Sequence, residues 1–300
     1  MKTIFVKNQE FKKLPEPVCA AIGNFDGVHL GHQKLFDECK RHNLKSAVLT
    51  FYPHPSVFLK KIKNYPLVTP IEHKIEIIES MGIDYLIIIE FNDEFANMDK
   101  DEFIKKIKML GIKSIVCGYD FTFGKYALGD KDDLAKEFDL YVVEKYIYDN
   151  VRVSTTYTRE LLQSGNVYEA SRMLGREYSI KGEVIKGLGY GKELGYPTAN
   201  IDYTNYFLPM TGVYLAKVKI ANKIYNGMAN IGHNPTVSFR DKPSLEVHIF
   251  DFDKDIYGLN IEVFFIDRIR NESKFQNLDM LKKQLEKDKN ECLKLLEKKE

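Results

Sequence analysis

Apolar and polar residues follow two different patterns along the chain. From residue 18 to about residue 147, short apolar runs alternate with segments in which apolar residues recur every three or four positions. The runs predict buried strands, and the recurring positions predict amphipathic helices. We expect strands at residues 18–22, 46–51, 85–89, 114–117 and 140–143, and helices at residues 33–43, 70–81 and 99–110. Repeated strand–helix units predict a doubly wound parallel sheet with helices on both faces.

The second half of the chain is rich in strand-like runs that no helical pattern separates. Two short helices are expected between residues 160 and 175, followed by strands at residues 178–185, 212–220, 223–231, 245–250 and 261–269. Such a series predicts a small antiparallel β-barrel. Residues 278–296 carry apolar side chains on one helical face, which predicts a terminal helix packed on the barrel. We therefore expect an α/β domain at residues 1–178 and a β domain at residues 179–300.

Composition narrows the class of protein. The 44 basic and 43 acidic residues leave a net charge of +1, which disfavours nucleic-acid binding through a broad basic face. No apolar run approaches the ~18 residues that a membrane-spanning helix needs, and the amino terminus lacks a signal-peptide core. The four cysteines form no Cys-x-x-Cys pair and indicate neither a disulfide framework nor a zinc site. We expect a cytoplasmic monomer or weak homo-oligomer that binds neither nucleic acid nor membranes.

The most informative stretch lies between the first predicted strand and the first helix. Its glycines permit a tight turn, which brings backbone N–H groups and a helix N-terminus to the carboxyl end of a strand. Phosphate binds well in such a place. His29 and His32 can both face one anion there and stabilise charge as it builds. The candidate phosphate-binding residues of this stretch are Gly23, Asn24, Phe25, Asp26, Gly27 and Gly31.

Three more segments fall at the carboxyl ends of predicted strands. His54 follows the second strand, and Asp120, Phe121 and Phe123 follow the strand at residues 114–117. Each of these two segments could also be a plain turn. The third segment contains Ser154, Thr155, Thr156 and Arg159 at the start of a helix. Its hydroxyls and guanidinium can bond phosphate oxygens, or a hydroxyl can simply cap the helix, and both can hold.

A glycine-rich stretch at residues 187–200 is the main feature of the second half. It matches neither the P-loop nor the dinucleotide-binding pattern, so a glycine-rich hairpin without a ligand is the alternative. Thr198 and Asn200 alternate on an extended segment, so their side chains point the same way. Mg²⁺ accepts such oxygen ligands beside nucleotide phosphates. The candidate nucleotide-binding residues here are Gly187, Gly189, Gly191, Lys192, Gly195 and Pro197, together with Thr198 and Asn200.

Residues 23–32 resemble the GxFDGxHxGH signature of the HxGH nucleotidyltransferases, in the version found in prokaryotic FAD synthetases. Residues 50–55, 118–124 and 154–159 resemble the TFxPHP, GxDFxFG and SSTxxR elements of that family. The resemblance implies a Rossmann-like domain that transfers AMP from ATP to FMN, giving FAD and pyrophosphate. It implies catalytic roles for His29, His32 and Arg159, and a flavin site at His54, Asp120, Phe121 and Phe123. Thr122 stands where many relatives carry Arg.

Residues 195–200 resemble the riboflavin kinase signature, and residues 230–236 and 245–251 resemble the NIGxxPT and LEVHxxD elements of the same family. This resemblance implies that the glycine-rich stretch covers ATP, with Lys192 at a position where Arg is common. Thr198 and Asn200 would bind Mg²⁺. Glu246 would be the general base for the riboflavin 5′-hydroxyl. Flavin contacts are implied for Asn230, Gly232, Arg270 and Phe275.

Together the resemblances cover about residues 15–290 and predict a bifunctional riboflavin kinase/FAD synthetase. Riboflavin, FMN and FAD would be its substrates and products, with ATP as co-substrate and Mg²⁺ as cofactor. One alternative is that only one half is active, as a kinase or as a synthetase. Another is a flavin- or nucleotide-binding sensor without turnover. The intact His29, His32 and Glu246 favour catalysis, because a protein that only binds has no need of a base.

Overall fold

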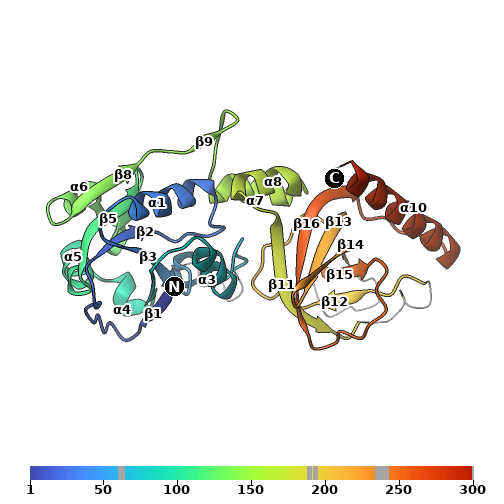
Figure 1. Ribbon diagram of the computed structural model, residues 1–300, viewed down its shortest axis with the longest axis horizontal. Coiled ribbons are helices and arrows are strands. Elements are labelled where there is room, and N and C mark those ends of the chain that lie inside the picture. The colour runs from blue at the N-terminus through green and yellow to red at the C-terminus, as the bar shows by residue number, and fades with distance from the viewer. Residues whose placement is uncertain (60–64, 188–190, 192–194, 234–242, 299–300) are drawn as a thin grey trace. The chain divides into compact units, whose positions relative to one another are not determined.

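The structure is a computed structural model that describes residues 1–59, 65–187, 191, 195–233 and 243–298 (Figure 1). The chain divides into two compact units, Met1–Thr155 and Thr156–Glu300. Most of helix α7 (Thr155–Gln163) and all of α8 (Val167–Leu174) group with the second unit. Helix α8 packs on two barrel strands, whereas the sequence analysis places both helices before the boundary at residues 178 and 179.

The first unit is built on a six-stranded parallel sheet in the order β1-β4-β3-β2-β5-β8. This confirms the predicted doubly wound sheet. The strands are β1 (Lys2–Val6), β2 (Val18–Ile22), β3 (Lys45–Tyr52), β4 (Tyr85–Glu90), β5 (Ile112–Gly118) and β8 (Asp139–Val143). Strand β1 was not predicted. It lies at the sheet edge with four of its five residues exposed or half-buried, so its sequence carries no long apolar run.

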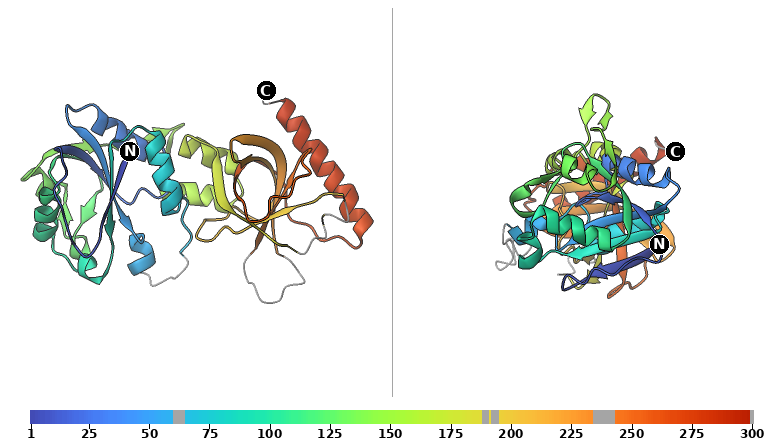
Figure 2. Two further views of the ribbon diagram at one scale, coloured as in Figure 1. Left: turned by 60° about the horizontal axis from the view of Figure 1, so that its bottom comes forward. Right: turned by 90° about the vertical axis from the view of Figure 1, so that its left-hand side faces the viewer.

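Helices cover both faces of this sheet, as Figures 1 and 2 show. On one face, α1 (Leu30–Lys40) and α3 (Ile71–Ser80) bury Phe36 and Ile78 against strand residues such as Cys19. On the other, α4 (Asp93–Ala96), α5 (Lys100–Met109) and α6 (Lys131–Ala135) pack on residues such as Ala20. Successive residues of a strand therefore pack into the cores on opposite faces of the sheet, which accounts for the unbroken apolar runs.

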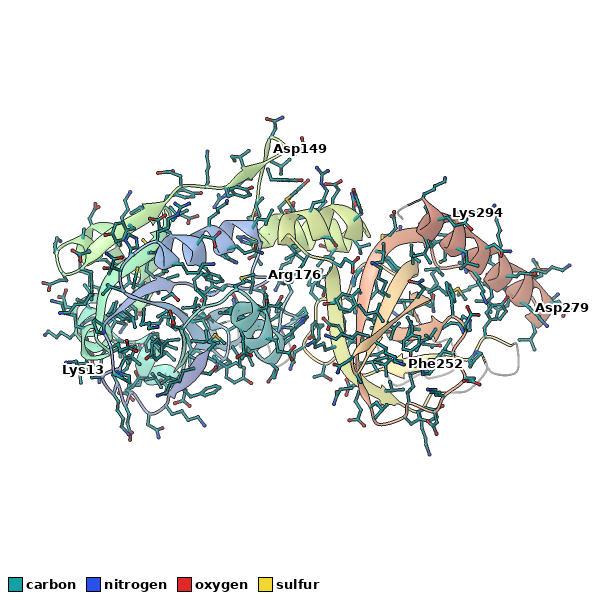
Figure 3. All side chains as sticks on the ribbon, viewed as in Figure 1. Lys13, Asp149, Arg176, Phe252, Asp279 and Lys294 are labelled. Carbon is teal, nitrogen blue, oxygen red and sulfur yellow. The ribbon has the colours of Figure 1, made fainter. Side chains whose placement is uncertain are left out.

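Short elements beyond the carboxyl ends of β3, β5 and β8 complete the first unit. They are α2 (Pro55–Leu59), the hairpin β6 (Thr122–Phe123) and β7 (Gly129–Asp130) with the turn η1 (Lys125–Ala127), and the hairpin β9 (Ile147–Tyr148) and β10 (Val151–Arg152). Asp149, labelled in Figure 3, and Asn150 have φ of 51° and 62° at the tip of the second hairpin. Two positive φ values are those of a tight hairpin turn. Two-residue strands have no periodicity to detect.

The second unit is a closed antiparallel barrel with the strand order β11-β12-β15-β14-β13-β16. This confirms the predicted barrel and its terminal helix. The strands are β11 (Tyr178–Ile185), β12 (Ala199–Ile201), β13 (Gly212–Ile220), β14 (Lys223–Gly232), β15 (Ser244–Ile249) and β16 (Asn260–Arg270). Strand β12 was not predicted. Its three residues begin within the end of the glycine-rich stretch, yet it closes the barrel between β11 and β15.

Helix α10 (Leu278–Glu297) lies beside the barrel (Figure 2), and a buried ion pair holds it there. The Arg270 guanidinium donates to both carboxylate oxygens of Asp288 at 2.8–3.0 Å, and Asp288 is 1% exposed. Figure 3 labels Asp279 in the first turn of α10 and Lys294 in its last turn. These charges suit the helix dipole at each end. No helix among the described residues is both long and apolar enough to cross a membrane.

Candidate active sites

The turn between β2 and α1 has an unusual backbone. Phe25, Gly27 and Val28 have φ of 51°, 83° and 44°. Side chains rarely adopt such angles, least of all a β-branched valine, and such strain persists only where the surroundings hold it. Phe25 and Val28 are 2% and 0% exposed, so their packing in the core contributes to holding the turn.

Hydrogen bonds from distant segments hold the polar groups of the same turn. The Asn24 carbonyl accepts from Thr50 Oγ1 at 3.1 Å and from Lys74 Nζ at 2.6 Å. The Asp26 carboxylate, 3% exposed, accepts from the Thr69 backbone N–H at 3.1 Å. The Asp26 carbonyl accepts from Thr155 Oγ1 at 2.9 Å. These contacts assign Asn24 and Asp26 a part in shaping the turn, whereas their predicted phosphate contacts stay predictions.

The two histidines of the turn form a stacked pair at the start of α1. Their ring centroids are 3.5 Å apart, with 16° between the ring planes. His29 Nδ1 accepts the backbone N–H of His32 at 3.2 Å, so His29 caps the helix and, when neutral, carries its proton on Nε2. A Cβ on Gly31 would lie 3.1 Å from the His29 ring, which explains glycine there. The helix begins three residues earlier than the sequence predicts, because the cap is a histidine.

A cavity of about 930 Å³ opens beside this pair, within the range of small-molecule sites. Its polar lining includes the two histidines and an ion pair of 2.8 Å between Arg152 and Asp120. Its aromatic lining includes residues that the sequence analysis missed, namely Phe51, Phe58, Phe91, Phe95 and Phe103. The predicted site residues that line the cavity are Gly23, Asn24, Phe25, His29, Gly31, His32, Asp120, Phe121, Phe123, Ser154 and Thr155.

Five predicted residues of the first site are missing from the described residues that line the cavity. Asp26 and Gly27 lie within the turn itself, and the other three lie elsewhere. His54 is missing from the described residues that line the cavity, and its Nδ1 accepts from the Ser56 backbone N–H at 3.1 Å. Thr156 and Arg159 belong to the second unit. There the Arg159 guanidinium lies 5.1 Å from the centroid of the Phe207 ring. The predicted roles of these three residues stay predictions.

In the barrel, polar side chains gather around the carboxylate of Glu246 on β15. Thr198 Oγ1 donates to one carboxylate oxygen at 3.3 Å, and Ser244 Oγ lies 3.2 Å from the other. Asn200 on β12 and Asn230 on β14 are the direct cross-strand partners of Glu246. The structure thus brings together four residues that the sequence singles out. Ser244 was missed because nothing marks a strand serine as functional in sequence.

The glycine-rich stretch passes close to this cluster. A Cβ on Gly187 would lie 2.0 Å from Asn200 Nδ2, and one on Gly191 would lie 2.4 Å from the Tyr196 carbonyl oxygen. Gly195 has φ of 81°, a left-handed conformation that favours glycine. Pro197 accepts a hydrogen bond of 2.9 Å from His248 Nδ1, and burial lowers the pKa of that histidine. The predicted residues Gly189 and Lys192 lie outside the described residues.

Comparison with known proteins matches each half of the chain to a family. A family model described as FAD synthetase matches residues 11–157, and one described as riboflavin kinase matches residues 174–296. A bifunctional riboflavin kinase/FMN adenylyltransferase of Bacillus subtilis (strain 168) is 40% identical over 98% of both chains. The chain belongs to this bifunctional family. A relative of the same description from Escherichia coli (strain K12) is 34% identical over 91% of both chains.

Among solved structures, one from Streptococcus pneumoniae that is described as a macrolide-efflux protein has a TM-score of 0.86. It is 33% identical and covers 97% of this chain and 98% of its own. Its description differs from those of the sequence relatives. The stacked histidines and the residues that line the cavity lie in the part of the chain that matches the FAD synthetase model. The match to riboflavin kinase contains Glu246 and the residues around it.

The remaining flavin residues predicted from the riboflavin kinase resemblance lie where β14, β16 and the segment after β16 meet. A Cβ on Gly232 would lie 2.6 Å from Glu272 Oε1, which also accepts the His233 backbone N–H at 2.9 Å. Arg270 lies 5.8 Å from the centroid of the Phe275 ring while it pairs with Asp288. Its role in holding α10 was not foreseen. The predicted flavin contacts of Gly232, Arg270 and Phe275 stay predictions.

Proposed function

We propose that the barrel phosphorylates riboflavin with ATP to FMN, and that the first unit transfers AMP from ATP to FMN to give FAD and pyrophosphate. The observation that carries this proposal is the presence of two differently built sites in one chain. One presents paired imidazoles at a helix start beside a large aromatic cavity. The other presents a carboxylate with a hydroxyl at hydrogen-bond distance from each of its oxygens.

In the first unit, the FMN phosphate is already a nucleophile, so positioning and charge stabilisation supply most of the rate. His29 and His32 would stabilise the charge that develops on the α-phosphate of ATP. Ser154 and Thr155 of the cavity wall would bind the other phosphate oxygens. The aromatic wall, which includes Phe121 and Phe123, suits a planar flavin ring.

In the barrel, Glu246 would accept the proton of the riboflavin 5′-hydroxyl as that oxygen attacks the γ-phosphate of ATP. The bond between the γ-phosphorus and the β-phosphate oxygen would break, and ADP would leave. The hydroxyl of Thr198 and the amide of Asn200 would hold Mg²⁺ together with the nucleotide phosphates. Their hard oxygen atoms fit that ion. Among the described residues, no group of three or more His, Cys, Asp or Glu that could hold a metal ion occurs. Bound there, Mg²⁺ supplies charge neutralisation to the phosphates.

Chromatography of flavins tests the proposed function. Incubation of the full chain with riboflavin, ATP and Mg²⁺ should convert riboflavin first to FMN and then to FAD. Incubation with FMN and ATP should yield FAD directly. A protein that leaves both riboflavin and FMN unchanged would contradict the proposal and favour flavin binding without turnover. Cytoplasmic localisation, the monomeric or weakly oligomeric state and the absence of nucleic-acid partners stay predictions from composition.

The close approach of Gly187 to Asn200 gives a first prediction. A Cβ at Gly187 would overlap the Asn200 amide, so Gly187→Ala must displace a side chain that we assign to Mg²⁺ and phosphate. A displacement of about 1 Å in a catalytic group can lower a rate by up to about 100-fold. We expect riboflavin phosphorylation to fall by about tenfold or more, while FMN adenylylation by the same protein stays unchanged. Equal loss of both activities would instead indicate misfolding.

A further inference from the structure

Lys74 is a buried cation to which neither proposed mechanism gives a role. It belongs to α3, and its side chain is 2% exposed. Its Nζ donates to the Asn24 carbonyl oxygen at 2.6 Å, and Thr50 Oγ1 donates to the same oxygen at 3.1 Å. Asn24 is the second residue of the turn that leads to His29 and His32. The ammonium group therefore lies directly against the loop that presents the two imidazoles.

The position of Lys74 in its helix is one where an apolar residue would be expected. Ile71 and Ile78 lie three and four residues from it, on the stripe that packs on the sheet. Burial of a charge is unfavourable unless the charge is paired or hydrogen-bonded. Burial lowers the pKa of Lys74 to about 8, although the nearby Asp26 carboxylate acts in the opposite direction. The side chain is thus charged at neutral pH and neutral in mildly alkaline solution.

We propose that Lys74 is a positioning residue for AMP transfer, which holds the Asn24 carbonyl and thereby fixes the turn that aims His29 and His32. This inference rests on the proposed function of the first unit. The strained φ values of Phe25 and Val28 mean that the turn depends on such contacts. A neutral amine is a weaker donor and no longer offsets the Asp26 carboxylate, so the turn loosens when Lys74 loses its proton.

The neighbours of Lys74 come from the turn, from β3 and from α3 itself. From the turn, the charged neighbour is Asp26, which raises the lysine pKa. Strand β3 contributes the uncharged Thr50 hydroxyl, and α3 itself contributes the adjacent, buried His73. Burial lowers the pKa of Lys74 to about 8, and its Nζ bonds the turn directly, so we assign to Lys74 a midpoint near pH 8 in the response of the turn.

The test compares two variants and a control in the full chain. Lys74→Met keeps a long apolar stem without the charge, Lys74→Arg keeps the charge, and Glu72→Gln alters an exposed residue of the same helix. We expect Lys74→Met to lower kcat for FAD formation by about tenfold or more. Riboflavin phosphorylation should stay within twofold, Lys74→Arg should retain more activity than Lys74→Met, and Glu72→Gln should match the parent.

The pH profile separates positioning from simple structural support. In the parent, the ratio of FAD formation to riboflavin phosphorylation should fall above about pH 8, and in Lys74→Met this fall should be absent. A Lys74→Met protein with full kinase activity and FAD formation within twofold of the parent would overturn the inference. A fall of the ratio that persists in Lys74→Met would do the same.

One measurement needs neither activity nor a stable variant. The backbone amide resonance of Gly27 in the parent should shift with a midpoint near pH 8, because the turn responds to the charge on Lys74. A Gly27 resonance that stays unchanged from pH 7 to pH 9.5 would refute the inference. A parent that makes no FAD yet shows the shift would reject the proposed AMP transfer and leave the coupling of Lys74 to the turn established.

Discussion

Replacement of His32 by alanine should lower FMN adenylylation by about 10²–10³-fold and leave riboflavin phosphorylation unchanged. Removal of one donor from a preorganised site for developing charge costs about 3–4 kcal/mol at the transition state. His32 stacks on His29 and contacts the edge of the Phe25 ring at 5.1 Å between centroids, so its imidazole is held in one orientation. Steady-state rates of FAD formation with saturating FMN and ATP measure the effect.

His42→Ala is the matched control for this experiment. His42 lies just beyond the other end of α1 and stacks on Tyr141 at 3.9 Å between centroids. It should change FAD formation by less than twofold. If His32→Ala raised KM for ATP and left kcat unchanged, the imidazole would contribute to ground-state binding alone. Its assignment to the transition state would then be wrong.

Replacement of Glu246 by glutamine should abolish most riboflavin phosphorylation and leave FMN adenylylation intact. General base catalysis contributes about 10²–10⁴-fold, and glutamine keeps the shape of glutamate without its basicity. The Thr198 and Ser244 hydroxyls can still bond the amide, so the site should stay assembled. The measurement is the rate at which riboflavin is consumed with ATP and Mg²⁺. The rate of FAD formation from added FMN in the same protein is the internal reference.

Glu183→Gln supplies the control in the same barrel. Glu183 lies on β11 and is exposed, and its substitution removes a carboxylate without touching the cluster. Riboflavin phosphorylation should be unaffected in this protein. A Glu246→Gln variant with normal kcat and only a raised KM for riboflavin would mean that the carboxylate binds the substrate and takes no part in proton transfer.

The sequence predicted those parts of the molecule that depend on neighbouring residues. The apolar runs identified β2 to β5, and the glycines with His29 and His32 marked the turn before α1. Contacts between distant segments could not be read in this way. Lys74 bonds Asn24, which lies 50 positions away in the chain, and Asp288 pairs with Arg270, which lies 18 positions away. Neither pair has a local signal, although a lysine on an apolar helical stripe is itself a clue.

The sequence analysis missed the short elements for a related reason. Strand β1 is an exposed edge and β12 has three residues, so both are strands because of the partner they meet rather than their own pattern. The sequence singled out Thr198 but not Ser244, and both hydroxyls come to lie beside Glu246 only because β12 and β15 pair. The aromatic wall of the cavity likewise combines residues from several helices, strands and loops that no single motif connects.

The burial of Lys74 has opposite effects on the stability of the first unit and on its proposed activity. In the unfolded chain the lysine has its ordinary pKa of 10.5, and in the folded protein the pKa is about 8. Between these values the unfolded state binds more protons, so this group makes the free energy of unfolding rise with pH, by about 3 kcal/mol in all. Below pH 8 both states are charged and the full destabilisation remains. Mild alkali should therefore give a first unit that resists unfolding better and adenylylates FMN more slowly.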